Sequence, residues 1–173
     1  MDNRIAVKYF APFGLLAVLV TAGAAAAHTG GANDGALSVK NADGRVVIVG
    51  KGAVIGRFDK GQVTIKDPNP YDGTGPIVTG ADRLEAVGER TTRYSGSNIR
   101  FRIIGGSFTV TVFGNDIDLS AVGRGMVTLN GSIAKGNGAN NDASYAVNGG
   151  APDAFPLFSL TFPLAAPPPN AGG

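Results

Sequence analysis

Histidine, cysteine and paired carboxylates carry much of the chemistry that proteins do, and this sequence offers few of them. Its 173 residues include no cysteine and a single histidine, His28. The lack of cysteine excludes thiol catalysis, Cys-based zinc sites and a lipidated cysteine anchor. His28 lies in a segment of small polar residues, and no second histidine or well-placed methionine completes a metal site around it. We therefore expect neither histidine catalysis nor a bound metal.

Asp116 and Asp118 are the best candidates for a carboxylate pair. They alternate with Ile117 and Leu119, as residues on one face of a strand do. Two such carboxylates could share a proton or bind calcium. The same pattern is typical of the solvated face of a strand whose other face is buried, and we favour that interpretation. Residues 67–73 also offer oxygen ligands, but Asx turns explain them better than an EF-hand, whose closing glutamate is missing.

Arginines supply the one charged cluster that suits ligand binding. The candidates are Arg90, Arg93, Arg100 and Arg102. Gathered on one surface, their guanidinium groups could hold anionic glycans or teichoic-type phosphates, although Glu85 and Glu89 could neutralise them. A sugar site built on aromatic platforms is disfavoured, because the sequence contains no tryptophan. The four arginines are thus binding candidates, and no residue is predicted to be catalytic, to bind a metal or to bind a cofactor.

Composition predicts the kind of elements that must position these residues. The 27 glycines and 10 prolines, against 16% charged residues, indicate many turns between short strands and not a helical bundle. The net charge of +2 gives no support to nucleic-acid binding. Without disulfides, stability must come from a hydrophobic core, for which the length of a single domain suffices.

The N-terminus has the three parts of a secretory signal peptide, predicted here as residues 1–27. Arg4 and Lys8 precede an apolar run over about residues 10–20, and small residues follow. The run is too short to span a membrane comfortably, so cleavage between Ala24 and His28 is expected, with an uncleaved membrane anchor as the alternative. We expect the mature protein to be secreted or to lie in the extracytoplasmic cell envelope, without membrane contact after cleavage.

The mature chain divides into three segments. Residues 28–36 have nothing to bury and are predicted to be a flexible leader. Residues 37–164 are predicted to form a single all-β domain, and residues 165–173 a disordered tail rich in proline and glycine. Within the domain, residues 83–94 are ambiguous between a helical turn and an edge strand, and Gly88 favours the strand.

Alternation of apolar and polar residues predicts the core. Its members are Val46, Ile48, Val63, Ile65, Ile99, Phe101, Ile103, Phe108, Val110, Val112, Leu119 and Leu129. Glycines at Gly44, Gly50, Gly52 and Gly61 are predicted to bound short strands. Gly105 and Gly106 are predicted to turn a two-residue hairpin between the strands on either side. About nine or ten short antiparallel strands result.

An internal similarity bears on how those strands pack. Residues 45–66 align with residues 109–130 without a gap, with matched glycines and apolar positions. A duplication would give two similar three-strand units, which bury their apolar faces either as two sheets packed face to face or as one sheet curled on itself. We therefore predict a β-sandwich or a closed barrel. The alternative is that any two segments with strands rich in glycine, valine and threonine share such matches because of their composition, without a duplication. A short β-solenoid, with successive strand-turn units stacked as rungs, is the competing fold.

The pattern of residue types in the chain resembles that of secreted all-β proteins of unknown function from high-GC bacteria. The segments that carry this resemblance are Gly-Lys-Gly-Ala-Val-Ile-Gly-Arg-Phe at 50–58 and Gly-Asn-Asp-Ile-Asp-Leu-Ser-Ala-Val-Gly-Arg-Gly at 114–125. The resemblance covers most of the mature chain and implies no activity.

The expected function follows from the chemistry that the sequence offers and lacks. We expect a non-enzymatic β-domain, secreted or associated with the cell envelope, with a structural or binding role. The expected partners are a cell-wall glycan, an anionic envelope polymer or another envelope protein. The alternative is a polysaccharide-active hydrolase whose two carboxylates are distant in sequence and meet in a cleft.

Overall fold

The computed structural model describes residues 31–132 and 142–167, so the predicted signal peptide and His28 lie outside the described residues. Within them the fold is all-β, as predicted, and a single antiparallel sheet contains every strand. The strands are β1 (Gly35–Lys66), β2 (Ile77–Gly88), β3 (Thr91–Ile103), β4 (Ser107–Gly131), β5 (Ser144–Val147), β6 (Asp153–Ala154) and β7 (Leu160–Leu164). In this part of the chain, no helix is long and apolar enough to cross a membrane.

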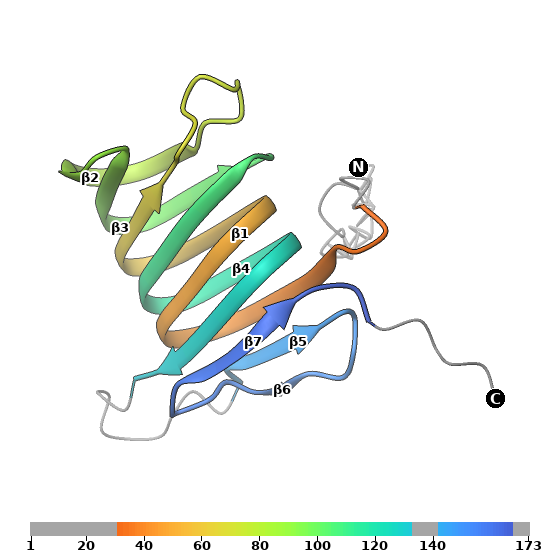
Figure 1. The fold of residues 1–173 in the computed structure, drawn as a ribbon. Helices are drawn as coiled ribbons and strands as arrows, with labels where there is room; N and C mark the ends of the chain where they lie inside the picture. Colours follow the sequence, from red (N-terminus) through yellow and green to blue (C-terminus); the bar gives the residue numbers. More distant parts are fainter. Residues whose placement is uncertain (1–30, 133–141, 168–173) are drawn as a thin grey trace, which may run out of the picture.

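Two unusually long strands build most of the sheet. β1 has 32 residues and β4 has 25, whereas strands of globular proteins usually have about five or six. The two strands pass each other twice, because Val46 of β1 pairs with Val112 of β4 on one side and with Leu129 of β4 on the other. Figure 1 shows the result, a coil in which both strands wind around the same interior.

The long strands bend as they wind (Figure 1), and glycines lie where their backbones approach each other closely. Gly61 has a φ angle of 153° and pairs with Gly114. A Cβ atom on Gly61 would lie 2.1 Å from the carbonyl oxygen of Phe113, so only glycine lets the two strands approach there. The prediction that Gly44, Gly50, Gly52 and Gly61 bound short strands was therefore wrong. These glycines bend β1 without reversing it, and the sheet has fewer and longer strands than predicted.

Gly105 and Gly106 link β3 to β4 without reversing the chain, because Ile103 and Ser107 pair with Val54 and Lys51 along the same edge of β1, so the predicted hairpin is not formed. The sheet order is β2-β3-β1-β4-β7, so β1 lies between the two strands that this link joins. Val54 of β1 pairs with Ile103 on one side and with Ala121 on the other. The residues that seemed ambiguous, 83–94, form the end of β2, a turn at Glu89 and Arg90, and the start of β3, and they contain no helix.

The core lies inside the coil and contains every residue predicted for it. Alternation identified these positions because long stretches of β1, β3 and β4 turn every second side chain inward. The structure adds buried residues that were not predicted: Leu37, Val39, Ala42, Val54, Phe58, Ile117, Ala121, Val127, Phe155 and Leu164. No polar or charged residue of the described chain is buried, so the interior is held by apolar packing alone.

The all-β class is confirmed, whereas the sandwich, barrel and solenoid details are not. The described strands form one continuous open sheet, and neither two separate sheets nor a closed barrel is present among them. Successive β4 segments do not stack as the rungs of a solenoid, because β1 lies between them. The segments aligned by the internal similarity, 45–66 and 109–130, are antiparallel partners, with Arg45 opposite Asn130 and Lys66 opposite Thr109. That they arose by duplication stays a prediction.

The two ends of the described chain lie side by side. β1 already begins at Gly35, within the segment predicted as a leader. The backbone N–H of Ala166, beyond β7, donates to the carbonyl oxygen of Asn33 at 3.1 Å. The short strands β5 and β6 complete this end of the sheet, since β5 pairs with the start of β1.

Candidate functional site

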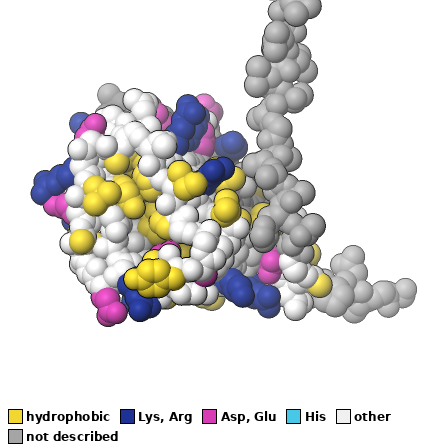
Figure 2. All heavy atoms as spheres, turned by 90° about the horizontal axis from the view of Figure 1, so that it is seen from above, with side chains coloured by type: hydrophobic (Ala, Val, Ile, Leu, Met, Phe, Trp, Pro, Cys, Tyr) yellow, Lys and Arg dark blue, Asp and Glu magenta, His cyan; other side chains and the backbone are white. Residues whose placement is uncertain are grey.

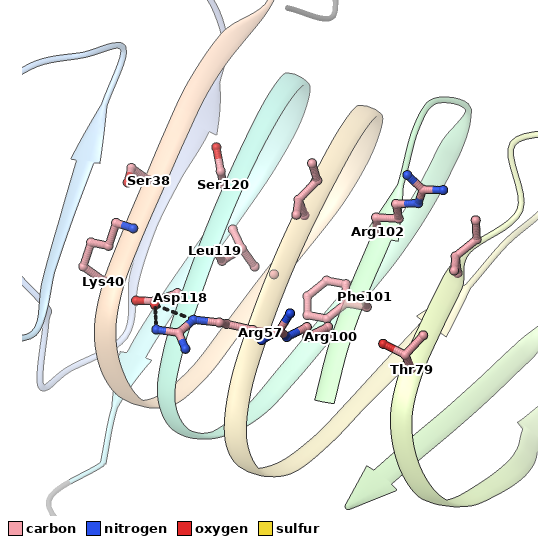
Figure 3. A pocket seen from close by; sticks show the side chains of 13 residues that line it. Ser38, Lys40, Arg57, Thr79, Arg100, Phe101, Arg102, Asp118, Leu119 and Ser120 are labelled. Atoms are coloured by element: carbon pink, nitrogen blue, oxygen red, sulfur yellow. Dashed lines mark hydrogen bonds and ion pairs between the residues drawn. The ribbon is translucent and has the colours of Figure 1, made fainter. Parts of the chain in front are cut away.

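Outward-facing side chains of neighbouring strand segments line a shallow groove of about 640 Å³. One row of these side chains, here called the charged row, crosses β2, β3, the second half of β1, β4 and the start of β1. Its members are Thr79, Arg100, Arg57, Asp118 and Lys40. Arg100 pairs with Thr79 and with Arg57, and Arg57 pairs in turn with Asp118. Figure 3 shows the row running across the strands.

A second row runs beside the first and combines apolar and hydroxyl side chains with one arginine. This mixed row consists of Ile77, Arg102, Ile55, Ser120 and Ser38. Each member is the cross-strand partner of the next, from β2 at one end to the start of β1 at the other. Ile77 and Ile55 are 47% and 41% exposed, so the mixed row presents hydrocarbon surface to the solvent on either side of Arg102.

Buried side chains support the groove from inside the coil. Phe101, between Arg100 and Arg102, and Leu119, between Asp118 and Ser120, both point into the core. The ring of Phe101 lies beside Gly56, where an added Cβ would be 2.5 Å from its Cζ atom. The inward packing therefore fixes which side chains of β3 and β4 must point outward into the groove.

Asp118 anchors the charged row. Its Oδ2 atom accepts hydrogen bonds from Nε and Nη2 of Arg57, at 2.8 and 2.5 Å, and its Oδ1 atom accepts one from the backbone N–H of Asn41 at 3.0 Å. Burial raises the pKa of Asp118, but the hydrogen bonds from Asn41 and Arg57 and the charges of Arg57 and Lys40 outweigh it, so the pKa lies below its ordinary value. Asp118 is thus a fixed anion that orients Arg57.

The other cations of the groove remain open to a ligand. Arg100, Arg102 and Lys40 are exposed, and none of them forms an ion pair with another described residue. Arg100 lies directly opposite Arg57, an arrangement of like charges that costs stability unless another group compensates it. Asp118 compensates Arg57, and the charge of Arg100 is left for the solvent or a ligand.

The predicted cluster of four arginines divides into two places. Arg100 and Arg102 line the groove, whereas Arg90 and Arg93 do not. Arg93 lies 3.7 Å from the carboxylate of Glu85, and Arg90 donates to the carbonyl oxygen of Pro68 from the turn between β2 and β3. Glu85 thus lies close enough to neutralise Arg93. Neither of these two residues lines the groove that contains Arg100 and Arg102.

Sequence reasoning missed Arg57 and Lys40, the other two cations of the groove. Arg57 could have been recognised as an outward-facing residue, because it stands next to the core residue Phe58 in a strand that was predicted. The position of Arg57 opposite Arg100 could not have been predicted, because the pairing of β1 with β3 joins segments that are far apart in sequence. Lys40 lies in the first pass of β1, where no strand was predicted.

The carboxylates considered for catalysis do not form a free pair. The carboxylate of Asp118 is held by Arg57, and Asp116 has a φ angle of 51°, which breaks the regular strand alternation on which the pairing was based. Among the residues that the structure describes, Asp118 is the only acidic one that lines the groove. Across residues 31–132 and 142–167, no three potential ligands gather in a way that could hold a metal ion.

The groove lies beside an apolar end of the sheet. Figure 2, which views the molecule from above Figure 1, shows hydrophobic side chains reaching the surface with lysine and arginine side chains around them. The strand at this end, β2, exposes Leu84 and Val87 in addition to Ile77 of the mixed row. The edge strand thus exposes apolar side chains both in the groove and outside it.

No protein-family model, curated protein or solved structure matches the chain. The functional argument therefore rests on the chemistry of the groove.

Proposed function

We propose that this protein is a non-enzymatic binding domain of the cell envelope or the secreted fraction, and that its groove binds a ligand carrying acid groups. The observation that carries the proposal is the pair of exposed arginines, Arg100 and Arg102, without ion-pair partners in the described chain. Their guanidinium groups can bind carboxylates or phosphates through two parallel hydrogen bonds each. Arg57, oriented by Asp118, adds a third guanidinium group beside them.

The chemistry of the groove supports binding over hydrolysis. A glycosidase of the usual kind needs two carboxyl groups across the bond to be cleaved, one of them with a raised pKa so that it can donate a proton. The groove presents one carboxylate, Asp118, and its pKa is lowered. A hydrolase that uses a carboxylate pair remains the second candidate, and a turnover assay on the same polysaccharides used for binding tests it.

Export and the choice of partner belong to the same proposal. A cell-wall glycan, an anionic envelope polymer or an acidic surface of another envelope protein would supply the acid groups. The predicted signal peptide would deliver the domain to that compartment. Mass spectrometry of the protein recovered from its natural host should find a new N-terminus between Ala24 and His28. An intact Met1 in the membrane fraction would instead indicate a membrane-anchored protein.

Charge reversal in the groove tests the binding role. We expect the cleaved protein to be retained on immobilised polygalacturonate and on phosphocellulose and to be released by salt, because salt screens exposed charges. The double variant Arg100→Glu and Arg102→Glu should weaken retention at least about tenfold, the loss expected when charge-assisted hydrogen bonds become repulsive.

The matched control has the same change of net charge outside the groove. Arg45 and Lys66 are exposed residues of β1 that do not line the groove. The variant Arg45→Glu with Lys66→Glu should therefore retain most of the binding. Equal loss in the two double variants would show that only net charge matters, and turnover that disappears in Asp118→Asn would establish the hydrolase.

A further inference from the structure

We propose that the ligand is a linear polysaccharide whose acid groups are spaced along the chain, and that it lies across the strands parallel to the charged row. This inference rests on the proposed function of the groove and specifies its ligand. The charged row extends over five strand segments, which at about 4.8 Å per segment is about 19 Å. Such a length suits an oligosaccharide segment and exceeds a single ion or sugar.

The cations are spread along this length and do not converge on one point. Arg100 and Arg102 stand on β3, and Lys40 stands on the start of β1, with β4 and the second half of β1 between them. Three strand spacings separate Arg100 from Lys40 along the row, or about 14 Å between the backbones. A single phosphate or carboxylate cannot contact both, whereas a chain with acid groups at intervals can.

The centre of the row indicates the spacing of those acid groups. There the positive charge of Arg57 is matched by the negative charge of Asp118, in contact at 2.5 Å. A polyanion with a charge on every short unit, such as polyphosphate, would have to place an anion against Asp118, which costs free energy. A chain with a neutral unit between acidic units places its acid groups at the two cationic ends instead.

The mixed row supplies the contacts that sugar rings need. Ile77 and Ile55 present hydrocarbon to the solvent, and sugar rings carry C–H faces that can cover it. Ser120 and Ser38 add hydroxyl groups that can exchange hydrogen bonds with sugar hydroxyls. A polymer of phosphate alone would use neither set of contacts, so the two rows together favour an acidic sugar chain.

Calorimetry with oligosaccharides of defined length tests the inference. The probes are hyaluronan oligosaccharides, which alternate glucuronate with a neutral sugar, together with glucuronate itself, polyphosphate and neutral dextran. We expect affinity to rise at least about tenfold from glucuronate to the hyaluronan tetrasaccharide, because the longer chain engages both cationic ends. Polyphosphate and dextran should bind more weakly than the tetrasaccharide at the same salt concentration.

Single variants locate the two ends of the ligand. Lys40→Glu should weaken binding of the tetrasaccharide and leave binding of glucuronate at Arg100 and Arg102 nearly unchanged, whereas Arg100→Glu should weaken both. Lys66→Glu, an exposed charge reversal outside the groove, is the control. Circular dichroism of each variant verifies that the fold is intact.

The possible failures are distinguishable. Affinity that does not depend on length, or polyphosphate binding as tightly as the tetrasaccharide, would overturn the spaced-acid inference and leave anion binding by the groove in place. Dextran binding as tightly would show that acid groups are not required and would contradict both. Absence of binding to every anion tested would overturn the proposed function itself.

Discussion

At the scale of single residues, Asp118 links the stability of the sheet to the chemistry of the groove. It joins β4 to both passes of β1, because it accepts hydrogen bonds from Arg57 on one side and from the backbone of Asn41 on the other. Its side chain is 16% exposed, so these contacts are partly shielded from water. Replacing it should therefore change both the stability of the fold and the orientation of Arg57.

The lowered pKa of Asp118 predicts a pH-dependent contribution to stability. Since the folded state holds the carboxylate charged, the contribution is complete above the ordinary pKa of 3.8 and is lost as the pH falls through the lower pKa of the folded state. We expect Asp118→Asn to reduce the free energy of unfolding by about 1 kcal/mol at neutral pH, because Arg57 is largely exposed and water screens the pair. Below the lowered pKa of the folded state, the variant and the parent protein should converge.

Urea titrations at several pH values measure this difference. Asp153→Asn, a change of an exposed aspartate on β6, is the control and should have little effect. A difference between parent and Asp118→Asn that stays constant down to pH 2 would show that lost packing, and not the charge, explains the effect.

At the scale of elements, glycines decide whether a strand ends or bends. Gly61 allows β1 to continue past a bend, with its Cα close to Gly114 of β4. We expect Gly61→Ala to reduce the free energy of unfolding by about 2 kcal/mol or more, because the φ angle of 153° is strained for alanine and its Cβ would clash with a backbone carbonyl.

A glycine-to-alanine substitution at a site with free space around the added Cβ provides the comparison. Gly75 has no atom within 4 Å of an added Cβ and no positive φ angle. Gly75→Ala should therefore be neutral or slightly stabilising, since alanine restricts the unfolded chain. Urea unfolding of both variants measures the two effects, and equal stability of the two would contradict the role given to the bend.

These elements also show what could be predicted from sequence. Alternation assigned the core correctly, because the inward or outward direction of a side chain depends on its immediate neighbours along the strand. The positions of Gly61 and Gly106 were recognised, but their roles were not distinguished. Both have positive φ angles, and a glycine of this kind can lie inside a long strand as well as in a link between two strands.

Which strands pair with one another could not be predicted from local sequence patterns, and the reason is physical. Gly105 and Gly106 link β3 to β4 without reversing the chain, and β1 fills the place beside β3 and also the place beside β4. That choice depends on how the whole apolar surface is buried. For the same reason Arg100 and Arg102, neighbours along one strand, were predicted as site residues, whereas Arg57 and Lys40 were not.

At the scale of the whole molecule, the double pairing of β1 and β4 makes the coil a cooperative unit. The middle of β1 is hydrogen bonded to β4 on both sides, so it cannot separate from the sheet without breaking two sets of contacts. β2 is at the end of the sheet, with β3 as its only neighbour among the described strands. Most of its residues are exposed, and its register with β3 is interrupted by bulges. The sheet should therefore be most stable at its centre and least stable at β2.

Amide hydrogen exchange measures this gradient directly. We expect amides at Val46 and Ile48 to exchange only when the whole protein unfolds, with the full free energy of unfolding, because both residues lie between two passes of β4 and are almost fully buried. Amides of β2 should exchange faster by several orders of magnitude through local opening, since separating an edge strand exposes little core. Exchange of β2 as slow as that of the centre, observed at high protein concentration and lost on dilution, would show that a second copy covers this edge. If slow exchange persisted on dilution, the stability gradient derived from the sheet order would be wrong.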